Sequence, residues 1–133
     1  SVALKFQPKP GSVVMCDFRT GFIVPEMVKY RPVVVIARHS SNSRLVTIVP
    51  LSTTAPAELK PYHHALSVNP LPDRKNIQCW AKCDMVMTVS LSRLDRYKTR
   101  VANVRQFVVP VLLKPDFEGI QHATAAALNL TGL

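Results

Sequence analysis

Short apolar runs separated by prolines dominate the pattern of hydrophobic and polar positions along this chain of 133 residues. Residues 12–18 alternate roughly between two faces, residues 32–38 form a continuous run rich in valine, and residues 44–51 repeat that composition after a polar turn. Alternation is typical of a strand with one covered face, and a continuous apolar run indicates a strand covered on both faces. The pattern therefore predicts a first strand followed by a central antiparallel hairpin.

More strand-like segments and one helix follow this hairpin. They lie at 62–68, 77–80 and 81–89, with a helical turn or loop at 92–100 and a last strand at 104–113. Pro115 suits the first turn of a C-terminal helix, whose buried stripe is expected to hold Phe117, Ile120, Thr124 and Ala127. We therefore predict one domain over residues 1–133, with a mainly β fold: a strongly curved antiparallel sheet or small barrel with a C-terminal helix.

The charge of the chain is strongly positive. Seventeen Lys and Arg residues stand against eight Asp and Glu residues, which gives a formal net charge of +9. Such a chain is attracted to RNA, DNA, acidic protein segments and anionic lipid before any specific recognition. An ordinary basic protein has the same balance, so charge alone does not decide among these partners.

The cysteines and the lengths of the apolar segments bear on metal binding and on the cellular location of the protein. The three cysteines, Cys16, Cys79 and Cys83, are an odd set without the further ligands that zinc requires, which indicates buried thiols and no metal site. The longest apolar runs, such as 33–37, are too short to cross a bilayer, and no apolar leader segment opens the sequence. We expect a cytoplasmic protein with neither membrane insertion nor a cofactor.

Two stretches beside the central hairpin could bind an anion. Arg31 precedes Pro32, and a proline favours an extended backbone at the residue before it. The guanidinium of Arg31 is therefore expected at the start of the buried strand, where it can reach solvent. Ser52 and Thr53 follow the partner strand, and antiparallel partners exchange ends, so these hydroxyls are expected to share one rim with Arg31. The alternatives are a solvated arginine and a turn whose hydroxyls bond local backbone.

Histidines and an aromatic–cation pair offer further chemistry. His63 and His64 are adjacent, so on a strand they face opposite sides and at most one can reach a given site as acid or base. Trp80 and Lys82 share a face on a strand, where they could stack on a nucleotide and neutralise its phosphate. Structural histidines and a core tryptophan with a solvated lysine remain open as alternatives. The basic segment 93–105 could follow a phosphate backbone, although solvated charge is its default explanation.

Four stretches of the chain also carry a family resemblance. They read PGSVVMCDF, PEMVKYRPVVVIA, TIVPLSTT and KCDMVMTVSLSRL. In their order and spacing they resemble the MazF/PemK-type toxins of bacterial toxin-antitoxin systems. The resemblance runs from Pro10 to Leu94 and extends loosely over the C-terminal helix.

The resemblance implies a fold, an activity and partners. It implies a small SH3-like or CcdB-like barrel, usually a homodimer, that cleaves single-stranded RNA such as mRNA without a metal. Attack by the ribose 2′-hydroxyl would leave a 2′,3′-cyclic phosphate and a 5′-hydroxyl. It also implies a cognate antitoxin whose acidic tail occupies the RNA groove, and the charge of +9 suits such a partner.

The same resemblance suggests site residues. The family's catalytic arginine falls on Arg31 and its catalytic threonine on Ser52, beside which Thr53 could hold a phosphate oxygen. The late basic residue of some members falls on Met87, so the proton is expected to be transferred by His64 or its neighbour, or by the substrate phosphate itself. Expected RNA contacts come from the loop after the first strand and from the later strands: Arg19, Glu26, Lys29, Tyr30, His63, Trp80, Lys82 and Met87.

Other classes of function stay open at this point. Met87, and Ser90 in place of an acid found in part of the family, favour a non-catalytic or protein-directed CcdB-like binding module. A basic protein that binds RNA without cutting it is the third reading. Incubation with labelled RNA separates the three, because only a nuclease creates new ends.

Overall fold

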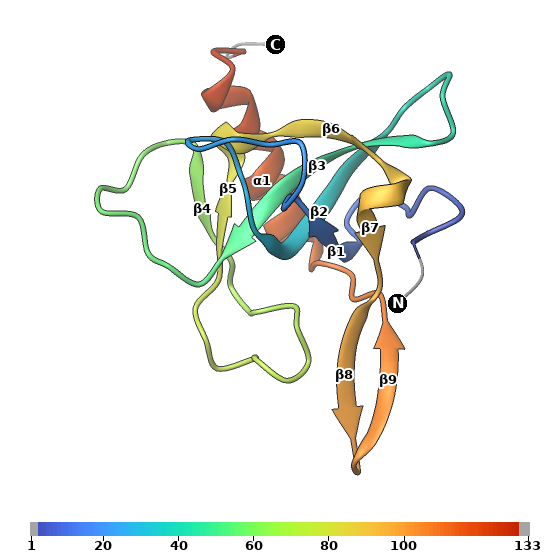
Figure 1. Cartoon of the computed structure of the whole chain (residues 1–133). Helices are drawn as coiled ribbons and strands as arrows, with labels where there is room; N and C mark the ends of the chain where they lie inside the picture. Colours follow the sequence, from blue (N-terminus) through green and yellow to red (C-terminus); the bar gives the residue numbers. More distant parts are fainter. Residues whose placement is uncertain (1–2, 131–133) are drawn as a thin grey trace.

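The computed structural model describes residues 3–130. Its elements in chain order are β1 (Val13–Asp17), β2 (Tyr30–Arg38), β3 (Leu45–Ser52), β4 (His63–Ala65), β5 (Trp80–Lys82), the 3-10 turn η1 (Cys83–Met85), β6 (Met87–Ser90), the 3-10 turn η2 (Leu91–Arg93), β7 (Leu94–Asp95), β8 (Tyr97–Val101), β9 (Val104–Val108) and the helix α1 (Lys114–Ala127) (Figure 1). The first seven strands form one sheet in the order β4-β5-β3-β2-β1-β7, with β6 also paired to β3, while β8 and β9 form a separate hairpin. Every pairing is antiparallel.

The predicted central hairpin is confirmed. Strand β2 pairs with β3 in a ladder that sets Val33 opposite Pro50 and Val34 opposite Val49, with a register shift near Ala37. Valines 33 to 35 are fully buried because both faces of the hairpin are covered, as their continuous apolar run predicts. One face packs under α1 and the other against a second cluster that includes Val14 and Cys16.

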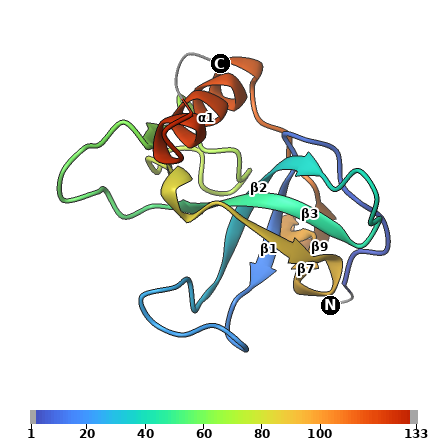
Figure 2. The ribbon, with the colours of Figure 1, turned by 90° about the horizontal axis from the view of Figure 1, so that it is seen from above.

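The sheet is rolled rather than closed. Strand β6 pairs with β3, and β7 pairs with β1 on the opposite side of the central hairpin. The link between β6 and β7 is the turn η2, so backbone continuity and not a ladder of hydrogen bonds joins the two sides. Figure 2 shows this roll, with α1 lying against one face of the sheet. The predicted mainly antiparallel β fold with a C-terminal helix is therefore confirmed. The barrel is incomplete, because no ladder of hydrogen bonds closes the sheet between β6 and β7.

Several predicted strands are shorter than their sequence pattern indicates. The segment 62–68 contributes only the three residues of β4, and from 77–80 only Trp80 enters a strand. The segment 81–89 is broken by η1, which begins at Cys83, into β5 and β6. Strands β5 and β6 pair with different parts of β3, which lets the sheet bend between them.

The segment 92–100 was expected to form a helical turn or loop. Residues 92–93 do belong to the turn η2, but residues 97–100 lie in the strand β8. Their alternation is regular: Tyr97 and Thr99 are buried, and the residues between them are exposed. The turn to β9 has Ala102 and Asn103 at φ 51° and 64°, the positive values that a two-residue hairpin turn requires. The hairpin projects from the body of the molecule at the lower right of Figure 1.

Helix α1 begins at Lys114, with Pro115 in its first turn as predicted. Its buried positions are Asp116, Ile120, Ala123 and Thr124. The expected stripe was right at Ile120 and Thr124, whereas Phe117 and Ala127 are only half-buried. An acidic residue therefore lies in the buried face, where pattern alone predicts apolar side chains.

Hydrogen bonds from the sheet explain this buried acid. Asp116 accepts them from the backbone and hydroxyl of Ser67, and its Oδ1 lies 3.0 Å from His64 Nε2. Burial alone would raise the pKa of Asp116, but the bonds from Ser67 and His64 outweigh it and lower the pKa. Gly119 lets the imidazole approach the helix this closely, because a Cβ at that position would overlap the ring. The contact fastens α1 to β4.

The predicted buried thiols are confirmed. Cys16, Cys79 and Cys83 are free and buried. Burial raises the pKa of Cys16 to about 12 and the pKa of Cys79 and Cys83 to about 11, so all three stay protonated at neutral pH. In the described range 3–130, no helix is both long and apolar enough to cross a membrane.

Candidate functional site

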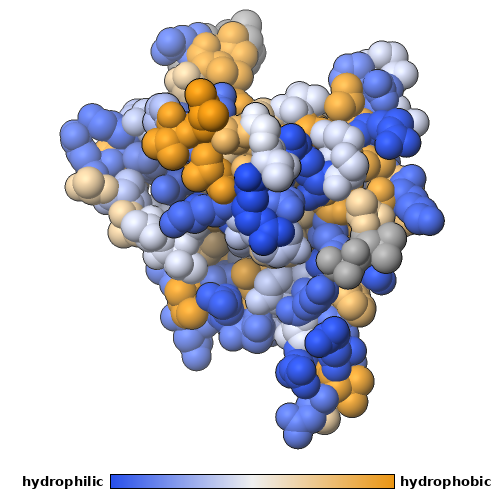
Figure 3. All heavy atoms as spheres, in the orientation of Figure 1, coloured by the Kyte–Doolittle hydropathy of each residue, from blue (hydrophilic) through white to orange (hydrophobic). Residues whose placement is uncertain are grey.

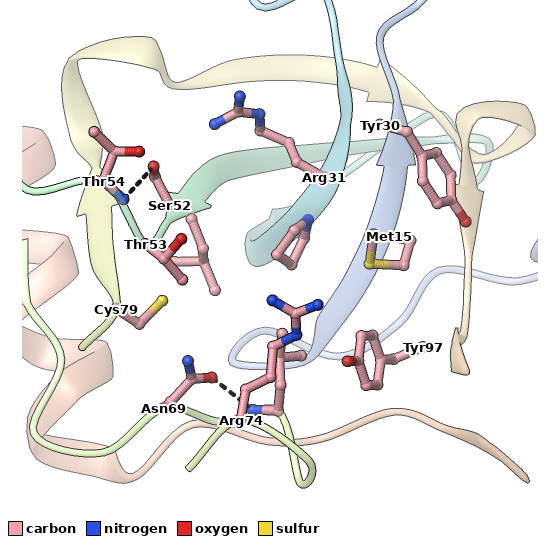
Figure 4. A pocket seen from close by; sticks show the side chains of 13 residues that line it. Met15, Tyr30, Arg31, Ser52, Thr53, Thr54, Asn69, Arg74, Cys79 and Tyr97 are labelled. Carbon is pink, nitrogen blue, oxygen red and sulfur yellow. Dashed lines mark hydrogen bonds between the residues drawn. The ribbon is translucent and has the colours of Figure 1, made fainter. Parts of the chain in front are cut away.

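A pocket of about 330 Å³ opens at the end of the central hairpin where β2 begins and β3 ends (Figure 4). The hairpin and the turn after it contribute Arg31, Ser52, Thr53 and Thr54. The other lining residues come from the same hairpin, from the loop between β4 and β5 and from the neighbouring strands β1 and β8: Tyr30, Pro32, Leu51, Asn69, Leu71, Arg74, Cys79, Met15 and Tyr97. The lining therefore holds two guanidinium groups and several hydroxyls, and it holds no Asp or Glu.

The geometry of the β2–β3 ladder brings Arg31 and Ser52 to one rim. The ladder sets Val33 opposite Pro50, and continuing this register two residues outward sets Arg31 opposite Ser52. The Oγ of Ser52 accepts a hydrogen bond from the backbone N–H of Thr54, at 3.1 Å. Because Oγ serves as the acceptor there, its own proton is free to be donated to a ligand in the pocket.

Arg31 is a partly desolvated cation that forms no ion pair with any residue of the described range. Its Nε is buried and has no hydrogen-bond partner among the described residues. Burial lowers the pKa of the guanidinium from its ordinary value, yet an arginine remains charged at any neutral pH. A buried donor left unbonded is costly. The guanidinium as a whole is only partly buried and lines the pocket, so its other N–H groups can meet an anion there. The positive charge of Arg31 therefore favours binding of a phosphate or carboxylate in this pocket.

Arg74 is a pocket residue that the sequence analysis missed. It lies in the loop between β4 and β5 and directs its guanidinium into the pocket (Figure 4). The neighbouring Asp73 accepts a hydrogen bond of 2.6 Å from the hydroxyl of Tyr97. Asn69 braces the same loop, since its side chain bonds Leu71 N and Ile77 O at 3.0 Å. The sequence around Asn69 is rich in proline, and from this pattern alone it is read only as a segment that interrupts strands. The asparagine was the one sequence signal for an ordered loop there.

Neither predicted histidine lines the pocket. His64, expected to transfer a proton, is held by Asp116 under α1. His63 accepts a hydrogen bond from Lys60 N–H through Nδ1, and its ring packs on Tyr62 at a centroid distance of 4.6 Å. Strand β4 lies on the far side of β5 from β3, which explains why both rings lie away from the pocket.

The predicted contacts on β5 and β6 also lie outside the pocket lining. Trp80 pairs directly with Ser52 in the β3–β5 ladder, so it lies beside the rim, half-buried, with Lys82 two residues further along the strand. Met87 pairs with Ile48 and packs against the second hydrophobic cluster. The position of the family's late basic residue is thus a packing position in this chain.

A second hollow of about 320 Å³ lies beside the first, between the start of the β1–β2 loop and residues 92–95, and Tyr30 lines both. Arg19 lines it as well, with its guanidinium 5.1 Å from the Tyr30 ring centre and 2.9 Å from Asp17. Hydrogen bonds from Arg19 lower the pKa of Asp17 to about 2. Glu26 accepts a bond from Ile23 N–H inside the loop, and Lys29 is exposed. Of the predicted loop contacts, Arg19 and Tyr30 therefore lie close to the pocket.

These features lie within a recognised family. Residues 9–109 match the family model described as the PemK-like, MazF-like toxin of type II toxin-antitoxin systems. The chain therefore belongs to this family, as its sequence motifs indicate. Its full length also aligns with the uncharacterized protein YifN of Escherichia coli (strain K12), with 31% identity over 152 positions that cover 99% of each chain.

Solved structures share the fold. One is an endoribonuclease in complex with its cognate antitoxin from Mycobacterial species, with a TM-score of 0.64 and 19% identity over 96% of this chain and 100% of that one. Another is MazF from Deinococcus radiodurans, with a TM-score of 0.67 and 14% identity over 94% of this chain and 99% of that one. At these identities the similarity establishes the rolled sheet and the helix, not the activity.

Proposed function

We propose that this chain is the toxin of a toxin-antitoxin pair and cleaves single-stranded RNA without a metal. The observation that carries the proposal is the pocket that Arg31, Arg74 and Ser52 all line, with no carboxylate in the lining. A site of this charge suits a phosphodiester. Membership of a toxin family supports the assignment, as does the fold shared with a protein described as an endoribonuclease.

Arg31 and Arg74 stabilise the phosphate in this mechanism. When the ribose 2′-hydroxyl attacks phosphorus, negative charge grows on the two non-bridging oxygens. Arg31 lines the pocket, and its guanidinium fork can donate two parallel hydrogen bonds to these oxygens. Arg74 approaches from the opposite wall, and the free proton of Ser52 supplies a further donor. Thr53 lines the same rim beside them.

Proton transfer follows a route without histidine. His64 is engaged with Asp116 away from the pocket, so we assign the transfer to the substrate itself. A non-bridging phosphate oxygen takes the 2′ proton, the O2′–P bond forms, and the P–O5′ bond breaks as the same proton passes to O5′. The products are a 2′,3′-cyclic phosphate and a 5′-hydroxyl, with atoms and charge conserved. The protein's part is electrostatic stabilisation and positioning.

Partners follow from the same proposal. A cognate antitoxin with an acidic tail would place carboxylates in the pocket that otherwise takes phosphate, which would block the site by competition. The structural relative solved with its cognate antitoxin supports this assignment. We further propose a homodimer as the working form, as in the family the motifs resemble. The mass of the purified protein in solution tests that assignment, and a monomer at working concentration would contradict it.

The test of the nuclease proposal is a cleavage assay. Purified protein is incubated with a long single-stranded RNA of mixed sequence, with and without EDTA, and the new ends are mapped and their chemistry determined. Cleavage that persists in EDTA with cyclic phosphate ends is expected. Intact RNA would refute the nuclease and favour a binding module, and loss of activity in EDTA would refute the metal-free mechanism.

Substitutions locate the activity in the pocket. Ser52→Ala is expected to lower the rate by about 10²-fold, the typical effect of removing one donor to a developing oxyanion. Arg44→Ala is the matched control for substitutions at Arg31 and Arg74, because Arg44 is an exposed arginine in the turn between β2 and β3. Unchanged cleavage in Ser52→Ala would remove this hydroxyl from the mechanism.

A further inference from the structure

The β8–β9 hairpin has two chemically different faces. Residues directly opposite each other in an antiparallel ladder point to the same side of the sheet. Tyr97, Thr99, Gln106 and Val108 therefore share the inner face, on which Tyr97 and Thr99 are buried. The outer face holds the residues between them, namely Arg96, Lys98, Arg100, Arg105 and Phe107. In Figure 3 the projecting hairpin is largely hydrophilic, with an apolar strip along one edge.

The outer face is charged in a way that the chain itself does not neutralise. Arg100 lies directly opposite Arg105 in the ladder, and like charges in that position are destabilising. No Asp or Glu occurs in the sequence between Asp95 and Asp116, so the hairpin has no acidic residue of its own. Within residues 3–130, none of the ion pairs involves these cations. A two-stranded hairpin is itself only marginally stable in water, so this arrangement suggests an anionic ligand.

An aromatic ring at the centre of this face adds a second property. The guanidinium of Arg96 stacks over the ring of Phe107 at 4.6 Å, and the ammonium of Lys98 lies 5.8 Å from the same ring centre. A stacked guanidinium presents a flat, charged surface on which nucleic acid bases stack. Cations around an aromatic platform are the combination that binds single-stranded nucleic acid.

The hairpin is also connected to the candidate active site. Lys98 lines the second hollow together with Arg19 and Tyr30, and Tyr30 lines the active-site pocket as well. A strand that leaves the pocket can therefore pass over Tyr30 and reach Lys98 on the hairpin, through a hollow that Arg19 and Arg93 line together with Asp17 and Asp95. The inner face of the hairpin meanwhile contacts the pocket wall through the bond between Tyr97 and Asp73.

We infer that the outer face of the β8–β9 hairpin is a second RNA-binding site, which holds the backbone of the single strand flanking the cleaved phosphodiester. The inference rests on the proposed function for its substrate. A second copy of the chain fits this face poorly, because two-fold pairing would set these cations against one another. An acidic peptide would neutralise the charge but has no base to stack on the Arg96–Phe107 pair.

Binding of uncleavable RNA tests the site apart from catalysis. A 2′-O-methyl oligonucleotide has no free 2′-hydroxyl, so its affinity can be measured even for an active enzyme. The variant is the double substitution Arg100→Gln and Arg105→Gln, which removes two exposed cations. The control is Arg44→Gln with Lys114→Gln, which removes the same charge at exposed positions on other elements. Thermal melting establishes that both proteins fold.

The expected result is a loss of affinity that depends on oligonucleotide length and salt. For two phosphate contacts on a single strand, the slope of log affinity against log salt should fall by about 1.4. Raising salt from 50 to 200 mM should then cost the wild type about sevenfold more affinity than it costs the variant, for an oligonucleotide of about 20 nucleotides. An oligonucleotide too short to reach from the pocket to Arg100 and Arg105 should bind both proteins equally.

The outcomes of these experiments test the hairpin site and the proposed nuclease activity separately. A salt slope equal to that of the control would overturn the inference even if the protein cuts RNA. Reduced binding of poly-glutamate with unchanged RNA binding would overturn it in favour of an acidic protein partner, and a changed mass in solution would overturn it in favour of self-association. The expected slope in a protein that cuts no RNA would uphold the hairpin site while refuting the proposed nuclease.

Discussion

Replacing Arg31 with methionine should make the protein more stable and inactive at once. The buried Nε of Arg31 has no partner among the described residues, and a buried unsatisfied donor costs about 1–3 kcal/mol. Methionine keeps an unbranched aliphatic chain and removes the buried polar group. We therefore expect the free energy of unfolding to rise by about 1–2 kcal/mol, since part of the guanidinium is solvated and loses little on removal.

Melting and cleavage measured on the same samples test this trade-off. For a domain of this size, the expected gain corresponds to a melting temperature higher by about 3–10 °C, while cleavage falls by at least about 10²-fold. Arg44→Met is the control, because it removes the same charge from an exposed position and so measures the general benefit of lowering a net charge of +9. A melting temperature below that of the wild type would refute the reasoning, because Arg31 would then be a structural residue.

Three further predictions concern the pocket wall and the helix contact. Gly119→Ala should lower the unfolding free energy by about 1–3 kcal/mol, because the new Cβ displaces the His64 ring; a thermal melt measures this, and an unchanged melting temperature would contradict the packing. The lowered pKa of Asp116 means that its contribution to stability is present above the ordinary value of 3.8 and is lost as pH falls below it, so denaturant titrations in acid should show a steeper decline for the wild type than for Asp116→Asn. Arg74→Gln should slow cleavage without changing the melting temperature, because Arg74 is exposed; unchanged kinetics would remove it from the mechanism.

Local pattern predicted the centre of the fold well. Strands β1, β2 and β3 begin and end within two residues of their predicted bounds, because buried valine runs and the polar turn between them specify a hairpin from neighbouring residues alone. The shared rim of Arg31 and Ser52 follows from the same hairpin geometry, and the structure places both in one pocket. What these side chains do there stays a prediction until cleavage is measured.

The features that pattern missed depend on contacts distant in sequence or on unusual turns. His64 and Asp116 are separated by 52 positions, and nothing near either residue indicates the other. The alternation of β8 is present in the sequence, but its cations favoured a solvated turn, and Ala102 gives no signal of a positive φ. Arg74 reaches the pocket only because its loop folds back on Tyr97, which is a tertiary contact.

The protonated state of Cys79 has a consequence for the conditions under which the pocket works. This thiol lines the pocket, and with a pKa of about 11 only roughly one molecule in 10⁴ carries the reactive thiolate at pH 7. Peroxide and disulfide reagents attack thiolates, so they should modify this wall of the pocket very slowly. Oxidants that inactivate enzymes with exposed, acidic cysteines should therefore leave this thiol unmodified.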